Sequence, residues 1–188
     1  MNKIRMGEDA SLSQIRIVPL SPDDHAEFIR DNQDAFNYGA LEEFGKRDDR
    51  FEEDGEIISI ETIEKAISEG EAYRIMRGGE KVGGAVLKTD GERGELELLF
   101  VAPAAHSKGI GYEAWRAIER IHPEVKVWET VTPYFEKRNI HFYVNRCGFH
   151  IVEFFWSLNP DPNDPENENS ETPAQFEEGM FRFEKRIE

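Results

Sequence analysis

The segment from His106 to Gly111, within the run VAPAAHSKGIGYEAW, holds residue types that could bind an anion. Gly109 and Gly111 stand where a strand-like run gives way to a helix-like one. The first N–H groups of a helix lack intrahelical partners and sit at the positive end of its dipole, and glycine lets phosphate oxygens approach the backbone. Ser107 adds a hydroxyl donor and Lys108 a cation. The segment therefore predicts either an anion cradle or a tight turn without a ligand.

The spacing of these glycines excludes both common nucleotide-binding fingerprints. The chain holds no G-x-x-x-x-G-K-S/T run, and the glycines of this segment do not form G-x-G-x-x-G. Any phosphate would therefore be held by a loop of a different kind.

A second group of chemically capable residues follows further along the chain. Asn139 and Tyr143 are four residues apart, so they share one face of an expected helix, while Ile140 and Val144 share another face suited to packing on a sheet. A tyrosine hydroxyl can donate a proton to a leaving group. Taken alone, Tyr143 fits a buried aromatic residue better; its combination with Asn139 and the glycine segment favours a functional role.

Carboxylates on the strand-like run before the glycine segment could accept a proton. Glu95 and Glu97 lie on one side of that run, because side chains alternate along a strand. Glu97 is the first candidate for a general base, acting directly or through water, and a solvated strand glutamate is the alternative. His141 and Glu129 are weaker candidates.

Periodicity and turn residues predict the elements that must position these groups. Strands are expected at 14–20, 72–78, 80–91, 91–103, 124–131, 149–158 and 179–187. Helices are expected at 21–39, at 59–70, over the run that carries Ile110 to Ile121, and at 133–148. The acidic segment 41–56 is interpreted as a loop or a short helix.

The order of these elements predicts the fold class. Antiparallel hairpins come first and strand–helix–strand crossovers follow, which predicts a mixed α/β sheet, mostly antiparallel, with helices on both faces. We expect one domain over 1–188, with an extra N-terminal segment at 1–13 and an acidic loop at 159–178 before the last strand. The D-x-N spacing in that loop resembles a calcium site, but the loop lacks the glycine and contains Pro162 and Pro165, so no metal is expected.

The composition excludes several classes of function. The formal net charge is −16, so the chain repels phosphate polyanions and nucleic-acid binding is not expected. The single cysteine, Cys147, allows no internal disulfide. The N-terminal run MNKIRMGEDASLSQ lacks the apolar core of a secretory signal, and no run approaches the ~20 apolar residues of a membrane span. We expect a soluble cytoplasmic protein that has no membrane partner.

The run FVAPAAHSKGIGYEAW resembles the acyl-CoA-binding motif of the GNAT superfamily of N-acetyltransferases, which reads V-x-P, a spacer, then Gln/Arg-x-x-Gly-x-Gly/Ala. The element order resembles that superfamily over nearly the whole chain. The resemblance implies that the backbone N–H groups of 106–111 grip the pyrophosphate of acetyl-CoA, and that Leu99, Phe100 and Val101 pair with the pantetheine arm. His106 departs from the usual Gln or Arg. A neutral histidine keeps one donor, so its grip on phosphate would become pH-dependent.

The run EKRNIHFYVNRCGF (136–149) resembles the later helix of the same superfamily, N-x-x-A-x-x-L-Y-x-x-x-G-F. The residues taken to fit that motif are Asn139, Phe142, Tyr143, Gly148 and Phe149. Together, the two motifs imply that the cofactor-binding residues are Leu99, Phe100, Val101, His106, Ser107, Lys108, Gly109, Ile110, Gly111, Tyr112, Asn139 and Phe142.

The resemblance also implies a mechanism. The acceptor amine attacks the thioester carbonyl directly, and Tyr143 protonates the departing CoA thiolate. A backbone N–H near Leu99 or Phe100 stabilises the charge that develops on the carbonyl oxygen. Glu97 takes the proton of the amine.

The acceptor is expected between the first helices, the crossover strands and the final hairpin, in segments 30–56 and 155–180. Both segments are rich in acidic residues, so a cationic amine, a polyamine or a basic peptide end is expected; the alternative is that these acids are only a solvated surface. The aromatic residues that could wall this site are Phe36, Tyr38, Phe44, Phe154 and Trp156.

Functions from different classes remain open. An acetyl-CoA-dependent N-acetyltransferase, with acetyl-CoA as cosubstrate and no metal, is favoured by Tyr143 and Asn139. The alternative is a non-catalytic acyl-CoA-binding or regulatory module on the same fold; His106 counts mildly against tight CoA binding. A phosphate-binding domain unrelated to CoA ranks last, because it requires the second motif to be accidental. A homodimer is expected only because similar proteins are commonly dimers.

Overall fold

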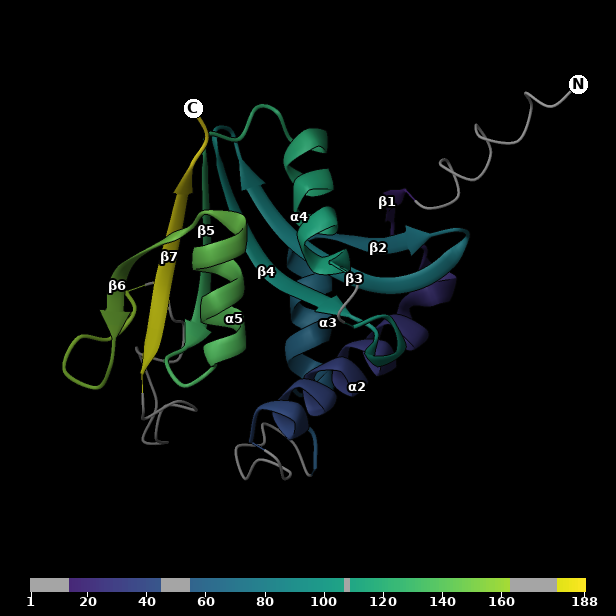
Figure 1. Cartoon of the computed structure of the whole chain (residues 1–188), viewed down its shortest axis with the longest axis horizontal. Helices are drawn as coiled ribbons and strands as arrows, with labels where there is room; N and C mark the ends of the chain where they lie inside the picture. Colours follow the sequence, from purple (N-terminus) through teal and green to yellow (C-terminus); the bar gives the residue numbers. More distant parts are fainter. Residues whose placement is uncertain (1–13, 45–54, 107–108, 163–178) are drawn as a thin grey trace, which may run out of the picture. The chain divides into compact units, whose positions relative to one another are not determined.

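The computed structural model describes residues 14–44, 55–106, 109–162 and 179–188. The chain (Figure 1) divides into two compact units. The first unit combines Met1–Lys88 with Leu96–Pro123, and the second combines Thr89–Glu95 with Glu124–Glu188. Each unit is considered by itself, and the expectation of a single domain stays a prediction.

The strands form a mixed sheet, as the element order predicts. In the described residues the sheet has seven strands in the order β1-β2-β3-β4-β5-β7-β6. Strands β4 and β5 pair in parallel, whereas β1–β2, β2–β3, β5–β7 and β6–β7 pair in antiparallel fashion. The strands are β1 (Ile15–Pro19), β2 (Glu71–Arg77), β3 (Glu80–Asp90), β4 (Arg93–Val101), β5 (Val127–Pro133), β6 (His150–Phe155) and β7 (Met180–Arg186).

The hairpin between β2 and β3 turns where the sequence predicts. Gly78 and Gly79 have φ values of 59° and 86°, the left-handed pair that a two-residue turn of this kind requires. The same unit begins with β1, which pairs with β2 over all five of its residues. These local signals therefore predicted the first strands correctly.

The helices also follow the predicted order. In the part of the chain that the structure describes they are α2 (His25–Phe44), α3 (Ile60–Glu69), α4 (Ile110–Ile121) and α5 (Lys137–His141). Helix α3 matches its prediction closely: the Ser59 side chain accepts a hydrogen bond from the Thr62 N–H at 3.0 Å, and Gly70 follows the last turn. Within the described ranges, no helix combines the length and the apolar character needed to span a membrane.

Helix α2 does not end at Gly39, which corrects the sequence prediction. A Cβ built on Gly39 would meet nothing within 4 Å, so the glycine serves no close contact with the neighbouring elements. Ala40, the residue that follows Gly39, is buried. Burial of the continuing apolar face outweighs the ~1 kcal/mol that an interior glycine costs, and the helix runs on to Phe44.

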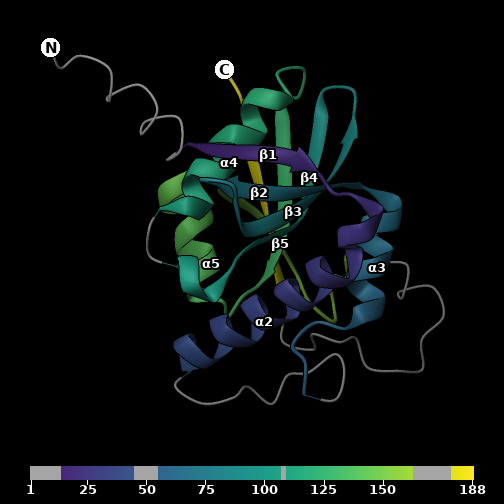
Figure 2. The same ribbon diagram turned by 90° about the vertical axis from the view of Figure 1, so that its right-hand side faces the viewer.

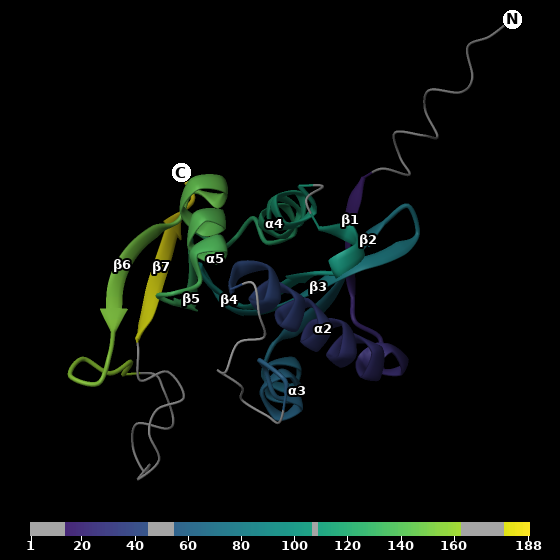
Figure 3. The ribbon, with the colours of Figure 1, turned by 60° about the horizontal axis from the view of Figure 1, so that its bottom comes forward.

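Helices cover both faces of the sheet in the first unit (Figures 2 and 3), as predicted. Successive residues of β4 point to opposite faces. Leu98 and Phe100 face α2 and α3, whereas Leu99 and Val101 face α4. The α2 and α3 side of the core contains Phe28, Ala35, Ile58, Ile63, Ala66 and Val86, and the α4 side contains Ile15, Ile75, Val82, Ala105, Ile110, Ala114 and Ala117.

A buried ion-pair network fixes the start of α2 on the sheet. The Arg74 side chain of β2 is 4% exposed, and its Nε and Nη2 atoms donate to Asp24 at 2.7 and 3.0 Å. Its Nη1 atom donates to Asp31 at 2.7 Å, and the guanidinium lies 5.1 Å from the ring centre of Phe28. The hydrogen bond from Arg74, reinforced by Lys81, lowers the pKa of Asp24 to about 2. A buried arginine needs such partners, because an uncompensated charge in the interior is costly.

The second unit departs from the predicted boundaries in two places. Strand β5 begins at Val127 rather than 124, because the N–H groups of Lys126 and Val127 both donate to the carbonyl of Glu92, which lies in the turn between β3 and β4. The helix expected over 133–148 begins at Lys137, and its second half, Phe142–Cys147, is π-helical. Figure 1 shows α5 lying against β5 and β7.

Candidate active site

The loop after β4 is held in a fixed turn. The Ala102 N–H donates to the Val82 carbonyl of β3 at 2.9 Å. Pro103–Ala105 form a 3₁₀ turn, and the His106 backbone N–H donates to the Pro103 carbonyl at 3.2 Å. Backbone hydrogen bonds therefore hold residues 102–106 in a defined conformation before α4 begins.

The predicted anion cradle falls at the start of α4. Gly109 is the N-cap, with φ of 73° in the left-handed region that favours glycine, and it has no side chain of its own with which to cap the helix. The Glu113 N–H donates to the Gly109 carbonyl at 3.0 Å. The N–H groups of Ile110 and Gly111 lie before this bond, so they belong to the helix start that attracts anions.

The end of β4 offers its backbone for contacts. Phe100 is 3% exposed and its ring packs against Phe28, so a cofactor could meet only the main chain of this residue. Leu99 and Val101 are half-buried on the α4 face. The other expected contacts in the loop, Ser107 and Lys108, lie outside the described residues.

His106 is engaged on two sides within the first unit. Its Nε2 atom lies 2.8 Å from the Val101 carbonyl oxygen, five residues earlier. Its ring meets the ring of Tyr38, on α2, edge to face with the centroids 4.8 Å apart. No local sequence pattern indicates this contact, because α2 and the loop are far apart along the chain.

Glu97, the predicted base, is part of a chain of ion pairs. Its Oε1 atom lies 2.8 Å from Lys88 Nζ, which is also 3.0 Å from Glu69 Oε2 at the end of α3. Burial works to lower the pKa of Lys88, but its hydrogen bonds with Glu97 and Glu69 outweigh burial, so the pKa is raised. Lys88 therefore stays charged, and Glu97 has to accept a proton through its other oxygen or after the pair opens.

The weaker base candidates lie in the second unit. Glu129 forms ion pairs with Arg93 and with Arg182, the latter at 3.1 Å. His141 is exposed, and its Nδ1 atom lies 3.1 Å from the side-chain nitrogen of Asn145. Both residues are therefore engaged by neighbouring side chains, and neither replaces Glu97 as the first candidate for the base.

Tyr143 lies in an aromatic cluster of the second unit. It is 8% exposed, and its ring centre lies 5.6 Å from those of both Phe149 and Phe183. Burial raises the pKa of Tyr143 to about 12, although a hydrogen bond with Thr130 works in the opposite direction. The hydroxyl therefore keeps its proton at neutral pH, as a proton donor must.

The π-helical turn explains a difference in spacing from the motif. The motif has three residues between its tyrosine and glycine, whereas four separate Tyr143 from Gly148. The Gly148 N–H donates to the Tyr143 carbonyl, which closes a π turn and absorbs the extra residue. Asn139 is four residues before Tyr143, not seven as in the motif, so it does not occupy the motif position assigned to it. Its side chain is exposed and lies 3.5 Å from Glu136.

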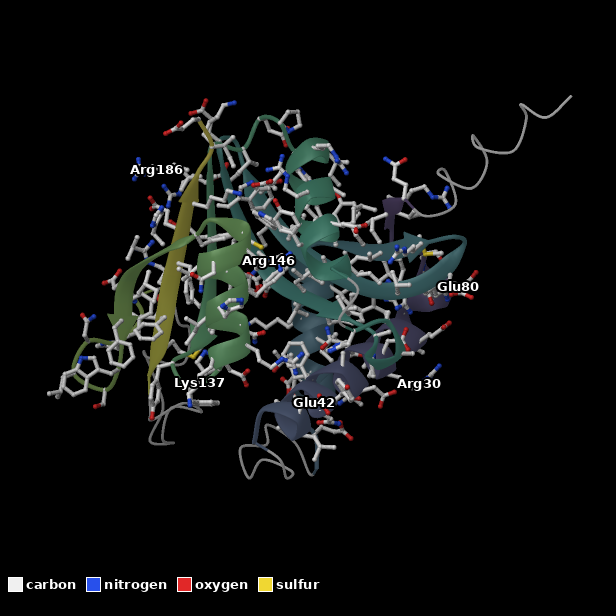
Figure 4. All side chains as sticks on the ribbon, viewed as in Figure 1. Arg30, Glu42, Glu80, Lys137, Arg146 and Arg186 are labelled. Carbon is white, nitrogen blue, oxygen red and sulfur yellow. The ribbon has the colours of Figure 1, made fainter. Side chains whose placement is uncertain are left out.

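The exposed surface of this helical segment is basic. Lys137, Arg138, His141 and Arg146 are exposed, and no acidic residue occurs between Lys137 and Cys147. Figure 4 shows Lys137 and Arg146 at opposite ends of the segment. In a chain with a net charge of −16, this is a local surface suited to an anionic group.

The expected aromatic wall of the acceptor site is divided between the units. Phe36 packs on the α2 side of the first core, and Tyr38 contacts His106 instead of standing alone. Phe154 and Trp156 belong to the second unit and are 38% and 45% exposed. The side chain of Phe44 lies outside the described part of the chain.

A family model decides which proteins this arrangement belongs with. The model of the acetyltransferase (GNAT) family matches residues 27–149, which include the turn after β4, the start of α4 and Tyr143. The chain belongs to the acetyltransferase (GNAT) family. The resemblance of the two motifs is thereby confirmed at the level of the family.

One protein is similar to the chain in sequence, and solved acetyltransferases are similar to it in fold. The chain is 42% identical over 167 residues to the uncharacterized protein YrkN of Bacillus subtilis, covering 86% of this chain and 88% of that protein. A GNAT family acetyltransferase from Elizabethkingia anophelis, solved with acetyl-CoA bound, matches 93% of this chain and 99% of its own at a TM-score of 0.59 and 18% identity. A Bacillus subtilis acetyltransferase in complex with CoA matches 93% and 98% at a TM-score of 0.58 and 17% identity. At these identities the solved structures show the GNAT fold.

Proposed function

We propose that the protein is an acetyl-CoA-dependent N-acetyltransferase that acts on a primary amine. The observation that supports this most is the left-handed Gly109 cap at the start of α4, directly after β4, in a chain of the GNAT family. The backbone N–H groups of Ile110 and Gly111 would hold the pyrophosphate. The main chain of Leu99 and Val101 would pair with the pantetheine arm.

Acetyl-CoA supplies the acetyl group as a thioester; the amine nitrogen bonds to the carbonyl carbon, and the carbon–sulfur bond breaks to leave a CoA thiolate. Tyr143 is the proposed acid that protonates this thiolate. Its raised pKa supports the role, since the residue is protonated at every pH at which the enzyme would work.

Glu97 is the proposed acceptor of the amine proton. Its position on β4, two residues before Leu99, whose main chain would pair with the cofactor, supports the assignment. Its ion pair with Lys88, at 2.8 Å, holds the carboxylate in place. We therefore assign Lys88 to positioning the base.

The proposed acceptor is a small cationic amine or a basic peptide end. The net charge of −16 supports this class, because an acidic surface raises the local concentration of cations. Association of a cationic acceptor with the protein then weakens as salt is added, whereas that of a neutral amine does not.

Release of free CoA thiol tests the function. The purified protein is mixed with acetyl-CoA and a pool of cationic, neutral and acidic amines, and free thiol is followed over time. Release that depends on a cationic amine supports the proposal. Binding of acetyl-CoA without release would instead support a non-catalytic acyl-CoA-binding module, and release with neutral or acidic amines alone would overturn the acceptor class.

A further inference from the structure

The ring of His106 is held by the protein itself. One ring nitrogen lies 2.8 Å from the Val101 carbonyl oxygen. The ring also forms a T-shaped contact with the ring of Tyr38, with the centroids 4.8 Å apart and an interplanar angle of 82°. All three residues belong to the first unit. We call these contacts the Tyr38–His106–Val101 brace.

The chemistry of the bond fixes the hydrogen on His106. A carbonyl oxygen can only accept, so Nε2 must carry the hydrogen and donate it to Val101. The neutral Nε2–H tautomer and the imidazolium both have this hydrogen. The bond to Val101 therefore does not depend on the charge of the ring.

The position of the brace links the cofactor loop to α2. Val101 ends β4, and His106 ends the 3₁₀ turn that precedes Gly109 and α4. The side-chain bond closes this loop a second time, alongside the backbone bond from His106 to Pro103. Tyr38 reaches the loop from α2, which carries the aromatic residues expected to face the acceptor.

We propose that His106 and Tyr38 are positioning residues, which hold the end of β4 and the approach to α4 in the shape that binds CoA. In this role His106 acts through the Val101 carbonyl and is not a ligand of the pyrophosphate. Tyr38 acts through His106 and transmits the position of α2 to the cofactor loop. This inference rests on the proposed function, because the ligand whose binding it affects is CoA.

A double-mutant cycle tests the brace. The variants are Tyr38→Ala, His106→Ala and the double variant, and the dissociation constant of CoA is measured by calorimetry for each. Each single change is expected to weaken CoA binding about tenfold, and the double change no more than either one, because contacting residues that act through one another are not additive. The KM for acetyl-CoA rises in parallel while kcat at saturation stays within about twofold, a split that general damage to the fold would not produce.

Conservative variants sharpen the test. Tyr38→Phe keeps the ring and His106→Gln keeps an N–H donor, so both should bind CoA within about twofold of the unaltered protein. Tyr134→Ala removes an exposed tyrosine of the second unit and serves as the matched control, with no expected change.

The brace is overturned if Tyr38→Ala leaves the CoA dissociation constant unchanged while His106→Ala raises it, since His106 would then contact the ligand directly. Fully additive losses would overturn it too. If the unaltered protein binds no CoA, the proposed function fails. The brace is then decided by amide hydrogen exchange at Ala104–His106: faster exchange in both single variants supports it, and unchanged exchange refutes it.

Discussion

At the scale of single residues, Tyr143 carries the most specific of the proposed chemical roles. Its pKa, raised to about 12 by burial, keeps the phenol protonated, and its hydroxyl already shares a hydrogen bond with Thr130. The same burial fits the alternative that Tyr143 is a packing residue of the aromatic cluster. Kinetics can separate these two roles, because only an acid acts on the chemical step.

Tyr143→Phe is expected to lower kcat about a hundredfold, the low end of what a lost proton donor costs. The dissociation constant for acetyl-CoA should stay within about twofold, since the aromatic ring and its packing against Phe149 and Phe183 remain. Steady-state kinetics and calorimetry measure the two quantities on the same preparation. Equal losses in turnover and affinity would remove Tyr143 from the acid role.

At the scale of elements, the start of α4 depends on the backbone conformation of Gly109. A β-branched residue is strained at φ of 73°, so Gly109→Val should distort the N-terminus of the helix and raise the CoA dissociation constant at least tenfold. Calorimetric titration with CoA measures the effect. Gly79→Val is the matched control, because Gly79 has φ of 86° and equally open surroundings but lies in the β2–β3 turn.

The control is expected to lose stability without losing CoA affinity. Unchanged CoA binding in Gly109→Val would refute the anion cradle at α4. Weakened binding in both variants would show only a general loss of structure.

The attachment of α2 to the sheet should depend on pH in the acid range. Asp24 has a folded-state pKa of about 2, below its ordinary value of 3.8, so its contribution to stability is present above about pH 4 and is lost as the pH falls towards 2. The shift corresponds to about 2 kcal/mol of unfolding free energy. Urea unfolding between pH 6 and about pH 2 is expected to show this loss, and Asp24→Asn should remove that part of the pH dependence.

The adjacent exposed residue provides the comparison for this experiment. Asp23→Asn should leave the acid-induced loss of stability unchanged. If Asp24→Asn and the unaltered protein lose stability in parallel, the Asp24–Arg74 pair does not hold α2 on the sheet.

Local sequence patterns predicted most elements, because caps, turns and apolar periodicity act over a few residues. The predicted start of α3 at Ser59, and the predicted turn between the strands at 72–78 and 80–91, are confirmed for this reason. Gly39 misled, because a locally unfavourable glycine is overridden by burial on either side. The π turn was missed as well, since a helix that gains one residue keeps almost the same apolar pattern.

The candidate site was predicted less completely, because its geometry depends on contacts between distant segments. The loop sequence placed Gly109 at the start of the helix, whereas its αL conformation was seen only in the structure. The pairing of Glu97 with Lys88, and of His106 with Tyr38, arises only when strands and α2 come together. The spacing of residues along the chain identified the chemical groups. It could not predict which of these groups form ion pairs or ring contacts with other parts of the fold.

At the scale of the whole molecule, the fold bears on the proposed acetyl donor, whereas the net charge bears on the proposed acceptor. Membership of the GNAT family and the α4 start support acetyl-CoA as the donor. The net charge of −16 concerns the acceptor, since a strongly acidic surface attracts cations. The basic surface of the α5 segment is a local exception, carried by side chains such as Lys137 and Arg146.

Transfer of a deuterium-labelled acetyl group from acetyl-CoA to an amine tests the central claim most directly. The protein is incubated with labelled acetyl-CoA and a cationic primary amine, and mass spectrometry measures the labelled amide beside the released CoA. We predict that labelled amide and free CoA form in equal amounts and that neither forms without protein. Bound acetyl-CoA with no transfer of the label, or release of CoA with labelled acetate as the product, would contradict the assignment as an N-acetyltransferase.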